Sequence, residues 1–316
     1  MVVISRHFWG TMTDNIRRHI RDVIVNAVAE RAGYIDRHGL DPSIWNPAAN
    51  WSPDAPNDYL KGYHRLAADE KAVHELRSLS QPFSGYDLRK LGTDPNAEAW
   101  IRMGTALRKQ VKRRLRVVAP PICGERGQRV WGGYLNHDTL AYQERMNLLA
   151  AGGVFEHLSR VKNPVLFEIG GGYGALALAL LRAVSKASYV ICDLPESLIY
   201  SGLYLSFAGL DVGVWPDRRR ITLLPNYRFL EFTGSIDLTI NTLSMSEMTE
   251  AQVRAYCEGI KERLAPSGLF FEQNQDNQHM GLINAPDIIA EYFPSRKPLT
   301  LPNHELQQGK ATIWST

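Results

Sequence analysis

The stretch that most constrains this chain is residues 165–174, Val165-Leu-Phe-Glu-Ile-Gly-Gly-Gly-Tyr-Gly174. Its first five residues are mainly apolar, with β-branched and aromatic members, which is typical of a buried parallel strand. Three consecutive glycines and a fourth at Gly174 let the backbone turn tightly and approach a ligand closely. The run from Ala175 to Val184 is rich in helix formers and places a helix N-terminus directly after the loop. Strand, glycine loop and helix predict a cofactor site.

The composition is that of a globular protein. Of 316 residues, 44% are hydrophobic and 22% charged, and a net charge of +3 does not indicate a general polyanion binder. Cys123, Cys192 and Cys257 form no C-x-x-C pair, so we expect a reducing compartment without disulfides or a zinc site. The N-terminal apolar run is too short for a signal peptide, and no stretch nears the ~18 uncharged apolar residues of a membrane span. We expect a cytoplasmic protein with no membrane partner.

Strands alternate with helices after Gly153. We expect strands at 165–169, 188–192, 220–224, 236–241, 268–272, 297–301 and 311–315. We expect helices at 175–184, around 198–207, at 249–264 and at 283–293. No helix separates the last two strands, so the final strand should pair as a hairpin, antiparallel to the rest. The predicted fold class is α/β, a Rossmann-like seven-stranded sheet with a helical N-terminal region.

The region before the sheet, residues 1–150, is expected to be a helical lid, substrate or dimerisation region, followed by a cofactor-binding domain at 151–316. Residues 36–58 hold Trp45, Trp51 and four prolines, which predicts an irregular segment with a functional or interfacial role. The basic run 108–116 is expected to be a helix, with either a solvated face or a phosphate contact. Asp138 or Thr139 is expected to cap the next helix.

The glycine loop on its own fits two cofactors. Gly170-x-Gly172-x-x-Ala175 satisfies the dinucleotide fingerprint, with Asp193 at the next strand end. Glu168, however, precedes the loop, and a carboxylate there can orient the ammonium of an amino-acid moiety. NAD offers no such cation. Together with the terminal hairpin, Glu168 favours S-adenosylmethionine.

Several motifs carry a family resemblance: residues 167–174, 189–196, 240–248 and 270–274, with 132–142 ahead of them. Through these motifs the chain resembles the class I S-adenosylmethionine-dependent methyltransferases and, more narrowly, the sugar O-methyltransferase family. The resemblance covers about residues 130–280. It implies S-adenosylmethionine as cofactor.

The resemblance also implies roles. The loop glycines would lie under the methionine and ribose, with Glu168 near the methionine end. Asp193 would accept hydrogen bonds from the ribose hydroxyls, although it could instead cap a helix. Asn226 would contact adenine, or be a simple turn residue, and Asn241 would lie beside the sulfonium. The expected cofactor residues are Glu168, Gly170, Gly172, Gly174, Asp193, Leu194, Asn226, Asn241 and Tyr142.

The residues after the fourth predicted strand bear on the atom that is methylated. Enzymes that methylate exocyclic amines often have Asp/Asn-Pro-Pro-Tyr/Phe there, whereas this chain has Asn241-Thr-Leu-Ser-Met245. That difference favours O-methylation. An alcohol acceptor needs a general base, and a carboxylate acceptor does not.

Five residues are candidate bases: His137, Glu247, His279, Asp138 and His304, the first three preferred in that order. His137 is free to face the cleft if Asp138 caps the helix. Glu247 follows the fourth strand, in the crevice where open α/β sheets bind substrates, or it favours a helix start. His279 lies in a polar run that is either a substrate wall or a solvated loop. We expect no metal.

The sequence therefore predicts a small-molecule O-methyltransferase, acting on a sugar or a sugar-containing natural product. A carboxylate acceptor, on a modified peptide or a natural-product acid, is the alternative. An RNA methyltransferase using residues 108–116 is a weaker hypothesis, and a dehydrogenase weaker still.

Overall fold

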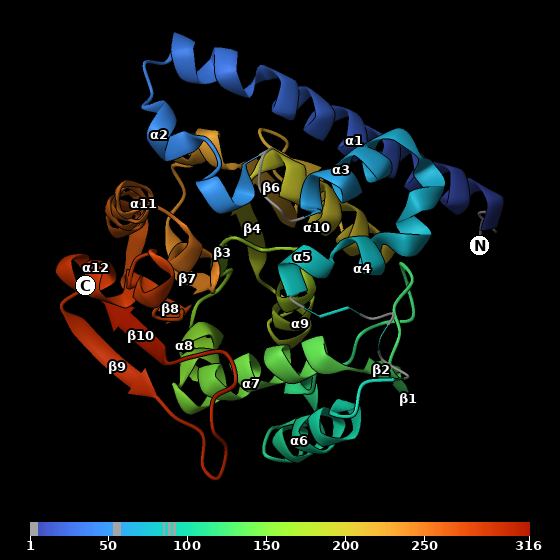
Figure 1. The fold of residues 1–316 in the computed structure, drawn as a ribbon, viewed down its shortest axis with the longest axis vertical. Helices are drawn as coiled ribbons and strands as arrows, with labels where there is room; N and C mark the ends of the chain where they lie inside the picture. The colour runs from blue at the N-terminus through green and yellow to red at the C-terminus, as the bar shows by residue number, and fades with distance from the viewer. Residues whose placement is uncertain (1–5, 53–57, 85, 88–89, 91–92) are drawn as a thin grey trace.

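A single eight-stranded sheet organises the computed structural model, which describes residues 6–52, 58–84, 86–87, 90 and 93–316. The strand order is β5-β6-β4-β3-β7-β8-β10-β9 (Figure 1). The strands are β3 Val165–Ile169, β4 Ser188–Asp193, β5 Val212–Val214, β6 Ile221–Pro225, β7 Ile236–Thr242, β8 Leu264–Gln273, β9 Ser295–Leu299 and β10 Ala311–Ser315. β10 pairs antiparallel with both β8 and β9, and the other pairs are parallel. The predicted seven-stranded sheet with an antiparallel last strand is confirmed, and β5 adds a short edge strand.

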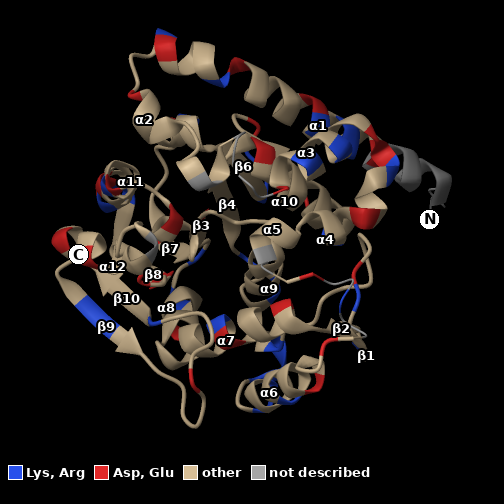
Figure 2. Ribbon diagram, in the orientation of Figure 1, with Lys and Arg blue, Asp and Glu red and all other residues tan. Residues whose placement is uncertain are grey.

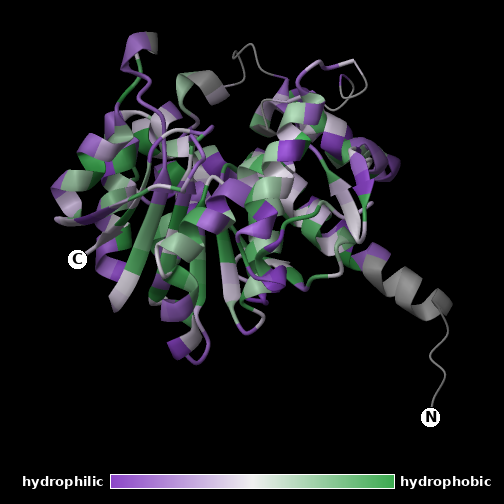
Figure 3. Ribbon diagram, turned by 90° about the horizontal axis from the view of Figure 1, so that it is seen from below, coloured by the Kyte–Doolittle hydropathy of each residue, from purple (hydrophilic) through white to green (hydrophobic). Residues whose placement is uncertain are grey.

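Both faces of the central sheet are buried, because residues of the central strands alternate between two hydrophobic clusters. Leu166 belongs to one cluster and Phe167 to the other. Figure 3 shows hydrophobic residues concentrated on the central strands. Helix α8 Val154–Arg160 precedes β3, and the helices after it are α9 Ala175–Ala183, α10 Pro195–Phe207, α11 Glu250–Arg263 and α12 Ala285–Tyr292. α9 and α10 pack on the face of Leu166, and α11 and α12 on the face of Phe167.

The N-terminal helices pack against the same sheet unit. They are α1 Arg6–Arg37, α2 Pro42–Trp45, α3 Tyr59–Ala68, α4 Leu76–Leu79, α5 Gln81–Ser84, α6 Ala97–Lys109 and α7 His137–Ala151. α1 lies along α10 and buries Ile20, Ile24 and Ala27, while charged residues of both signs occur elsewhere on it (Figure 2). The Tyr200 hydroxyl donates to the Tyr59 carbonyl at 2.7 Å. These contacts join the N-terminal helices to the core.

Short 3-10 turns complete the chain: η1 Ala49–Trp51, η2 Glu70–Glu75, η4 Arg113–Leu115, η5 Asn226–Glu231, η6 Ser244–Glu247 and η7 Gln278–Met280. A small antiparallel hairpin pairs β1 Gln128–Val130 with β2 Gly133–Leu135. Within the described part of the chain, no helix combines the length and apolar character needed to cross a bilayer.

Two predicted helical features are wrong. The basic run is not one helix, because α6 ends at Lys109, Arg113–Leu115 forms the 3-10 turn η4, and the chain is extended from Arg116. Leu115 and Val117 are buried there. The Val117 amide donates to Gln143 Oε1 at 2.8 Å, which fixes this extended path. Helix α7 is capped by Asn136, whose side chain accepts from the Thr139 amide, and not by Asp138 or Thr139.

Candidate active site

A cavity of about 300 Å³ lies where β3, β4, β6 and β7 end, between the sheet and the N-terminal segment. Ligands of open α/β sheets bind at this edge. Eight of the residues predicted as functional line the cavity: Glu168, Gly170, Gly172, Asp193, Leu194, Asn226, Tyr142 and Glu247. Gly174, Asn241, His137 and His279 do not belong to its wall.

The glycine loop forms the floor of the cavity, and its backbone requires glycine. Gly170 and Gly172 have φ values of 74° and 53°, in the left-handed region. A Cβ on Gly170 would lie 2.2 Å from Ser244 Oγ, so no larger residue fits there. Gly174, with φ 87°, is the N-cap of α9 and packs near Leu205, so its role is in the turn.

Asp193 ends β4 and faces the loop. Its Oδ2 accepts from the Gly172 amide at 3.2 Å and its Oδ1 from the Leu194 amide at 2.7 Å. Burial raises the pKa of Asp193 to about 7, although these amide donors favour the ionised form. Leu194 is the N-cap residue of α10, without a capping side chain. Asp193 therefore lies at the cavity edge rather than at a helix cap.

Two buried groups of opposite charge line the cavity. Glu168 is 2% exposed, accepts from the Tyr189 hydroxyl at 2.9 Å, and has its pKa raised to about 8 by burial. Arg145, on α7, is 6% exposed, and its Nε donates to Gln273 Oε1 at 3.2 Å. This is the only hydrogen bond that the guanidinium makes to the described residues, so its other N–H donors are available to a ligand. A carboxylate and a guanidinium on one cavity suit a zwitterion.

Sequence reasoning missed Arg145. A signal was present, since Arg145 follows Tyr142 by three residues and both therefore lie on one face of a helix. The Arg145 guanidinium carbon lies 5.4 Å from the centre of the Tyr142 ring.

Asn226 presents an unpaired acceptor at the cavity wall. The residue is 4% exposed, and its Nδ2 donates to the Trp45 carbonyl at 2.9 Å. Its Oδ1 is buried and has no hydrogen-bond partner among the residues that the structure describes. A buried, unpaired oxygen is costly, so a ligand that donates an N–H here would restore the bond.

Glu247, on η6, lies beneath an aromatic cover. Trp51 Nε1 donates to its Oε2 at 2.7 Å, and burial raises the pKa of Glu247. The Trp51 ring stacks on Phe83 with a centroid distance of 5.4 Å and an interplanar angle of 8°. Both aromatic residues come from the N-terminal segment and line the cavity. Within the 36–58 segment, residues 53–57 lie outside the described residues.

Asn241 braces a turn instead of facing the cavity. It is fully buried, and its Nδ2 donates to the Ile169 carbonyl at 2.9 Å and to Ser244 Oγ at 2.6 Å. Its Oδ1 accepts from the Met245 amide at 3.3 Å. With its amide used by the protein, Asn241 has no free donor for a ligand. Leu243, in the same turn, adopts a strained φ of 67° and lines the cavity.

The histidines among the candidate bases lie elsewhere. His137 stacks on Tyr86 at 5.0 Å and meets the Trp100 ring at 4.7 Å. His279 is on η7, and His304 Nε2 lies 2.7 Å from Glu144 Oε2. In the part of the chain that the structure describes, no group of three His, Cys, Asp or Glu residues could hold a metal.

Comparison with known proteins gives a partial relative. The release factor glutamine methyltransferase of Deinococcus radiodurans is 34% identical over 128 residues, which are 39% of this chain and 42% of that protein. The chain thus spans less than half of that relative's length. No family model matches the chain.

Solved methyltransferases show distant likeness. The N-methyltransferase NodS of Bradyrhizobium japonicum, in complex with S-adenosyl-L-homocysteine, is 13% identical, with 55% of this chain and 85% of that chain covered and a TM-score of 0.38. An S-adenosylmethionine-dependent methyltransferase of Clostridium acetobutylicum is 10% identical, with 55% and 90% covered and a TM-score of 0.41. The fold itself is read from the sheet. Its strand order, with the glycine loop at the end of β3, is that of the class I S-adenosylmethionine-dependent methyltransferases.

Proposed function

We propose that the chain is an S-adenosylmethionine-dependent O-methyltransferase. The observation that carries the cofactor assignment is the pairing of Glu168 with Arg145 on the wall of one cavity. Glu168 suits the amino group and Arg145 the carboxylate of a methionine moiety. Asp193 would accept from the ribose hydroxyls, and Asn226 Oδ1 would accept from the adenine amine. A nicotinamide dinucleotide has no amino-acid end to use the charged pair.

The bound cofactor supplies a methyl group already activated by a sulfonium. The protein's contribution is to orient the acceptor and to remove its proton. Glu247 is the one of the five candidate bases that lines the cavity. Its raised pKa makes it a stronger proton acceptor than an exposed carboxylate, and Trp51 fixes its orientation. We assign Glu247 as the general base for an alcohol acceptor.

The acceptor proposed is a sugar or a sugar-containing natural product. Trp51 and Phe83 offer apolar ring faces, which suit the C–H faces of a sugar, beside the polar group of Glu247. A carboxylate acceptor, which needs no base, remains the alternative. The partial relative acts on glutamine by its name, which makes an amide nitrogen a second candidate. Asn241 Nδ2 offers such an amide no free donor, because both of its N–H groups are used by the protein.

Calorimetric titration tests the cofactor assignment. S-Adenosylhomocysteine should bind more tightly than methylthioadenosine, which lacks the amino-acid end, by about tenfold or more. This ratio corresponds to the free energy of one or two charge-assisted hydrogen bonds. Arg145→Gln should remove most of that difference, because only the amino-acid end meets Arg145. Binding of NAD in preference to S-adenosylhomocysteine would refute the assignment.

Methyl transfer from labelled S-adenosylmethionine to a panel of sugars, carboxylic acids and glutamine peptides tests the acceptor. Glu247→Gln should lower turnover of a sugar by about 10²-fold or more while S-adenosylhomocysteine affinity stays unchanged. Glu250→Gln, at the first residue of α11 where the side chain is 60% exposed, is the matched control and should have no effect. Full turnover by Glu247→Gln would contradict the assignment of Glu247 as general base and favour a carboxylate acceptor.

A further inference from the structure

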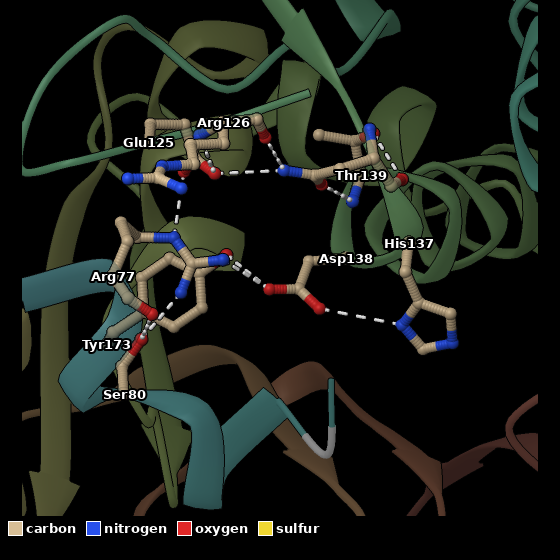
Figure 4. Close-up of polar contacts among 9 residues, drawn as sticks. Arg77, Ser80, Glu125, Arg126, His137, Asp138, Thr139 and Tyr173 are labelled. Atoms are coloured by element: carbon tan, nitrogen blue, oxygen red, sulfur yellow. Dashed lines mark hydrogen bonds and ion pairs between the residues drawn. The ribbon is translucent and has the colours of Figure 1, made fainter. Parts of the chain in front are cut away.

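A fully buried arginine lies behind the cofactor loop, in a cluster that the proposed chemistry does not use. Arg77 is 1% exposed and comes from α4, in the N-terminal region. Its guanidinium carbon lies 3.8 Å from the centre of the Tyr173 ring. Tyr173 is the non-glycine residue of the loop and is itself 2% exposed. Arg77 therefore contacts the loop by stacking on Tyr173 (Figure 4).

The guanidinium is held from three sides. Arg77 Nε donates to Glu125 Oε2 at 2.8 Å, Nη2 to Asp138 Oδ2 at 2.5 Å, and Nη1 to Ser80 Oγ at 2.5 Å. These partners come from the loop before β1, from α7 and from the end of α4. A planar, fork-shaped guanidinium can satisfy all three and still present a face to a ring, which an ammonium cannot.

The same contacts lead to the loop and to the aromatic cover. The Tyr173 hydroxyl donates to Asp138 Oδ2 at 3.3 Å, so Asp138 binds both the arginine and the tyrosine. Ser80 directly precedes α5, which carries Phe83 to the cavity wall. The loop bends through three positive-φ glycines, so the packing of Tyr173 is a strong restraint on its course.

We infer that Arg77 is a positioning residue. By stacking on Tyr173 it fixes the conformation of the glycine loop and its position relative to the N-terminal region. Glu125 and Asp138 hold the guanidinium in place, and Asn136 holds Glu125 Oε1 at 2.9 Å. Arg77 does not line the cavity, so it acts on a ligand indirectly, through the residues it holds in place. The expected consequence for cofactor affinity rests on the proposed function, whereas the effect on the loop does not.

Hydrogen exchange of the full-length chain, without ligand, tests the effect on the loop. Arg77→Lys should speed exchange of the amides of residues 170–174 by about tenfold, the range of couplings carried by packed networks. Tyr173→Leu keeps every polar partner of Arg77 other than the tyrosine and should do the same. Loop exchange in the double variant should be no faster than in either single variant, since both substitutions break the same Arg77–Tyr173 contact.

The matched control is Arg21→Lys. Arg21 is also buried, at 6% exposed, and its Nε donates to the Leu66 carbonyl at 3.0 Å within the N-terminal region, far in sequence from the loop. This variant should lower the midpoint of thermal unfolding without changing loop exchange. If Arg77→Lys does not fold, the test is the comparison of loop exchange in Tyr173→Leu, where it should be faster, with loop exchange in Arg21→Lys, where it should be unchanged.

Titration with S-adenosylhomocysteine gives the second readout. Arg77→Lys and Tyr173→Leu should each weaken binding by about tenfold, and Arg21→Lys should not. Loop exchange equal to wild type in either folded variant overturns the positioning role. Absence of S-adenosylhomocysteine binding by the wild type would instead refute the proposed function and leave the exchange test intact.

Discussion

At the scale of single residues, burial makes each acid of the cavity a weaker acid than usual, and the neighbours decide what each can do. Glu168, Asp193 and Glu247 all have raised pKa values, with burial as the largest cause. Glu168 faces the cavity with Arg145, Asp193 accepts backbone amides, and Glu247 accepts from Trp51. The sequence predicted all three as site residues, because they lie at or shortly after the carboxyl ends of predicted strands. The burial that tunes them comes from chain segments far away in sequence.

The pKa of Glu168 predicts a pH dependence of stability. Its folded-state pKa is about 8, above the usual 4.5, so the folded state holds this proton more tightly than the unfolded state. Stability from this group is full below pH 4.5 and is lost as the pH rises through 8. Glu168→Gln, which stays neutral, should flatten the fall in the thermal midpoint of the ligand-free chain between pH 5 and pH 8.

The control for this pH effect is Glu98→Gln, at a carboxylate whose side chain is 90% exposed. It should leave the wild-type pH profile as it is. An identical slope in Glu168→Gln and wild type would show that Glu168 ionises in the folded chain as it does in the unfolded one.

At the scale of elements, the sequence predicts those helices and strands whose formation depends on their own residues and their immediate neighbours in the chain. The apolar runs of β3 and β10 carry their own periodicity and flanks, and the predicted bounds are those of the structure. The three-residue β5 has too short a pattern to recognise, and it forms because it pairs with β6. The basic run 108–116 has helix-forming residues, yet α6 ends at Lys109 and the 3-10 turn η4 follows, with Leu115 and Val117 buried. Tertiary contacts overrode local propensity there.

The start of helix α7 shows the same difference between features set by local sequence and features set by tertiary contacts. The pattern before α7 predicted a cap in the right place, but Asn136 provides it, in a capping box with Thr139. Asp138 was expected at the cap, and instead it binds Arg77, which is 61 residues earlier in the chain. No spacing rule reveals a partner at that distance. The same holds for the candidate site: the place of Arg145 on the cavity wall and the stacking of Trp51 on Phe83 depend on how distant elements are assembled.

At the scale of the whole molecule, the N-terminal helices and the sheet share one core. A single buried cluster contains Ile24 of α1 and Leu66 of α3 together with Leu166 of β3. Buried polar contacts cross the same boundary: Arg31 pairs with Glu196 at 2.9 Å, and the Tyr227 hydroxyl donates to the Ala27 carbonyl at 2.9 Å. The cavity wall is likewise built from both regions. Substrate contacts and stability thus depend on the same packing.

This shared core predicts one cooperative unfolding transition for the full chain. Scanning calorimetry should give a ratio of calorimetric to van't Hoff enthalpy of about 1, since neither region keeps its buried surface without the other. A fragment of residues 151–316 would expose the apolar side of α10 that α1 and α3 cover, along with Tyr200, and it should not reproduce that transition. Two resolved transitions, with the fragment accounting for one of them, would instead establish a boundary near residue 150 between regions that fold independently. S-Adenosylhomocysteine at about 100 times its dissociation constant should then move the single transition as a whole, by the equivalent of roughly 2.7 kcal/mol, because its site is built from both regions.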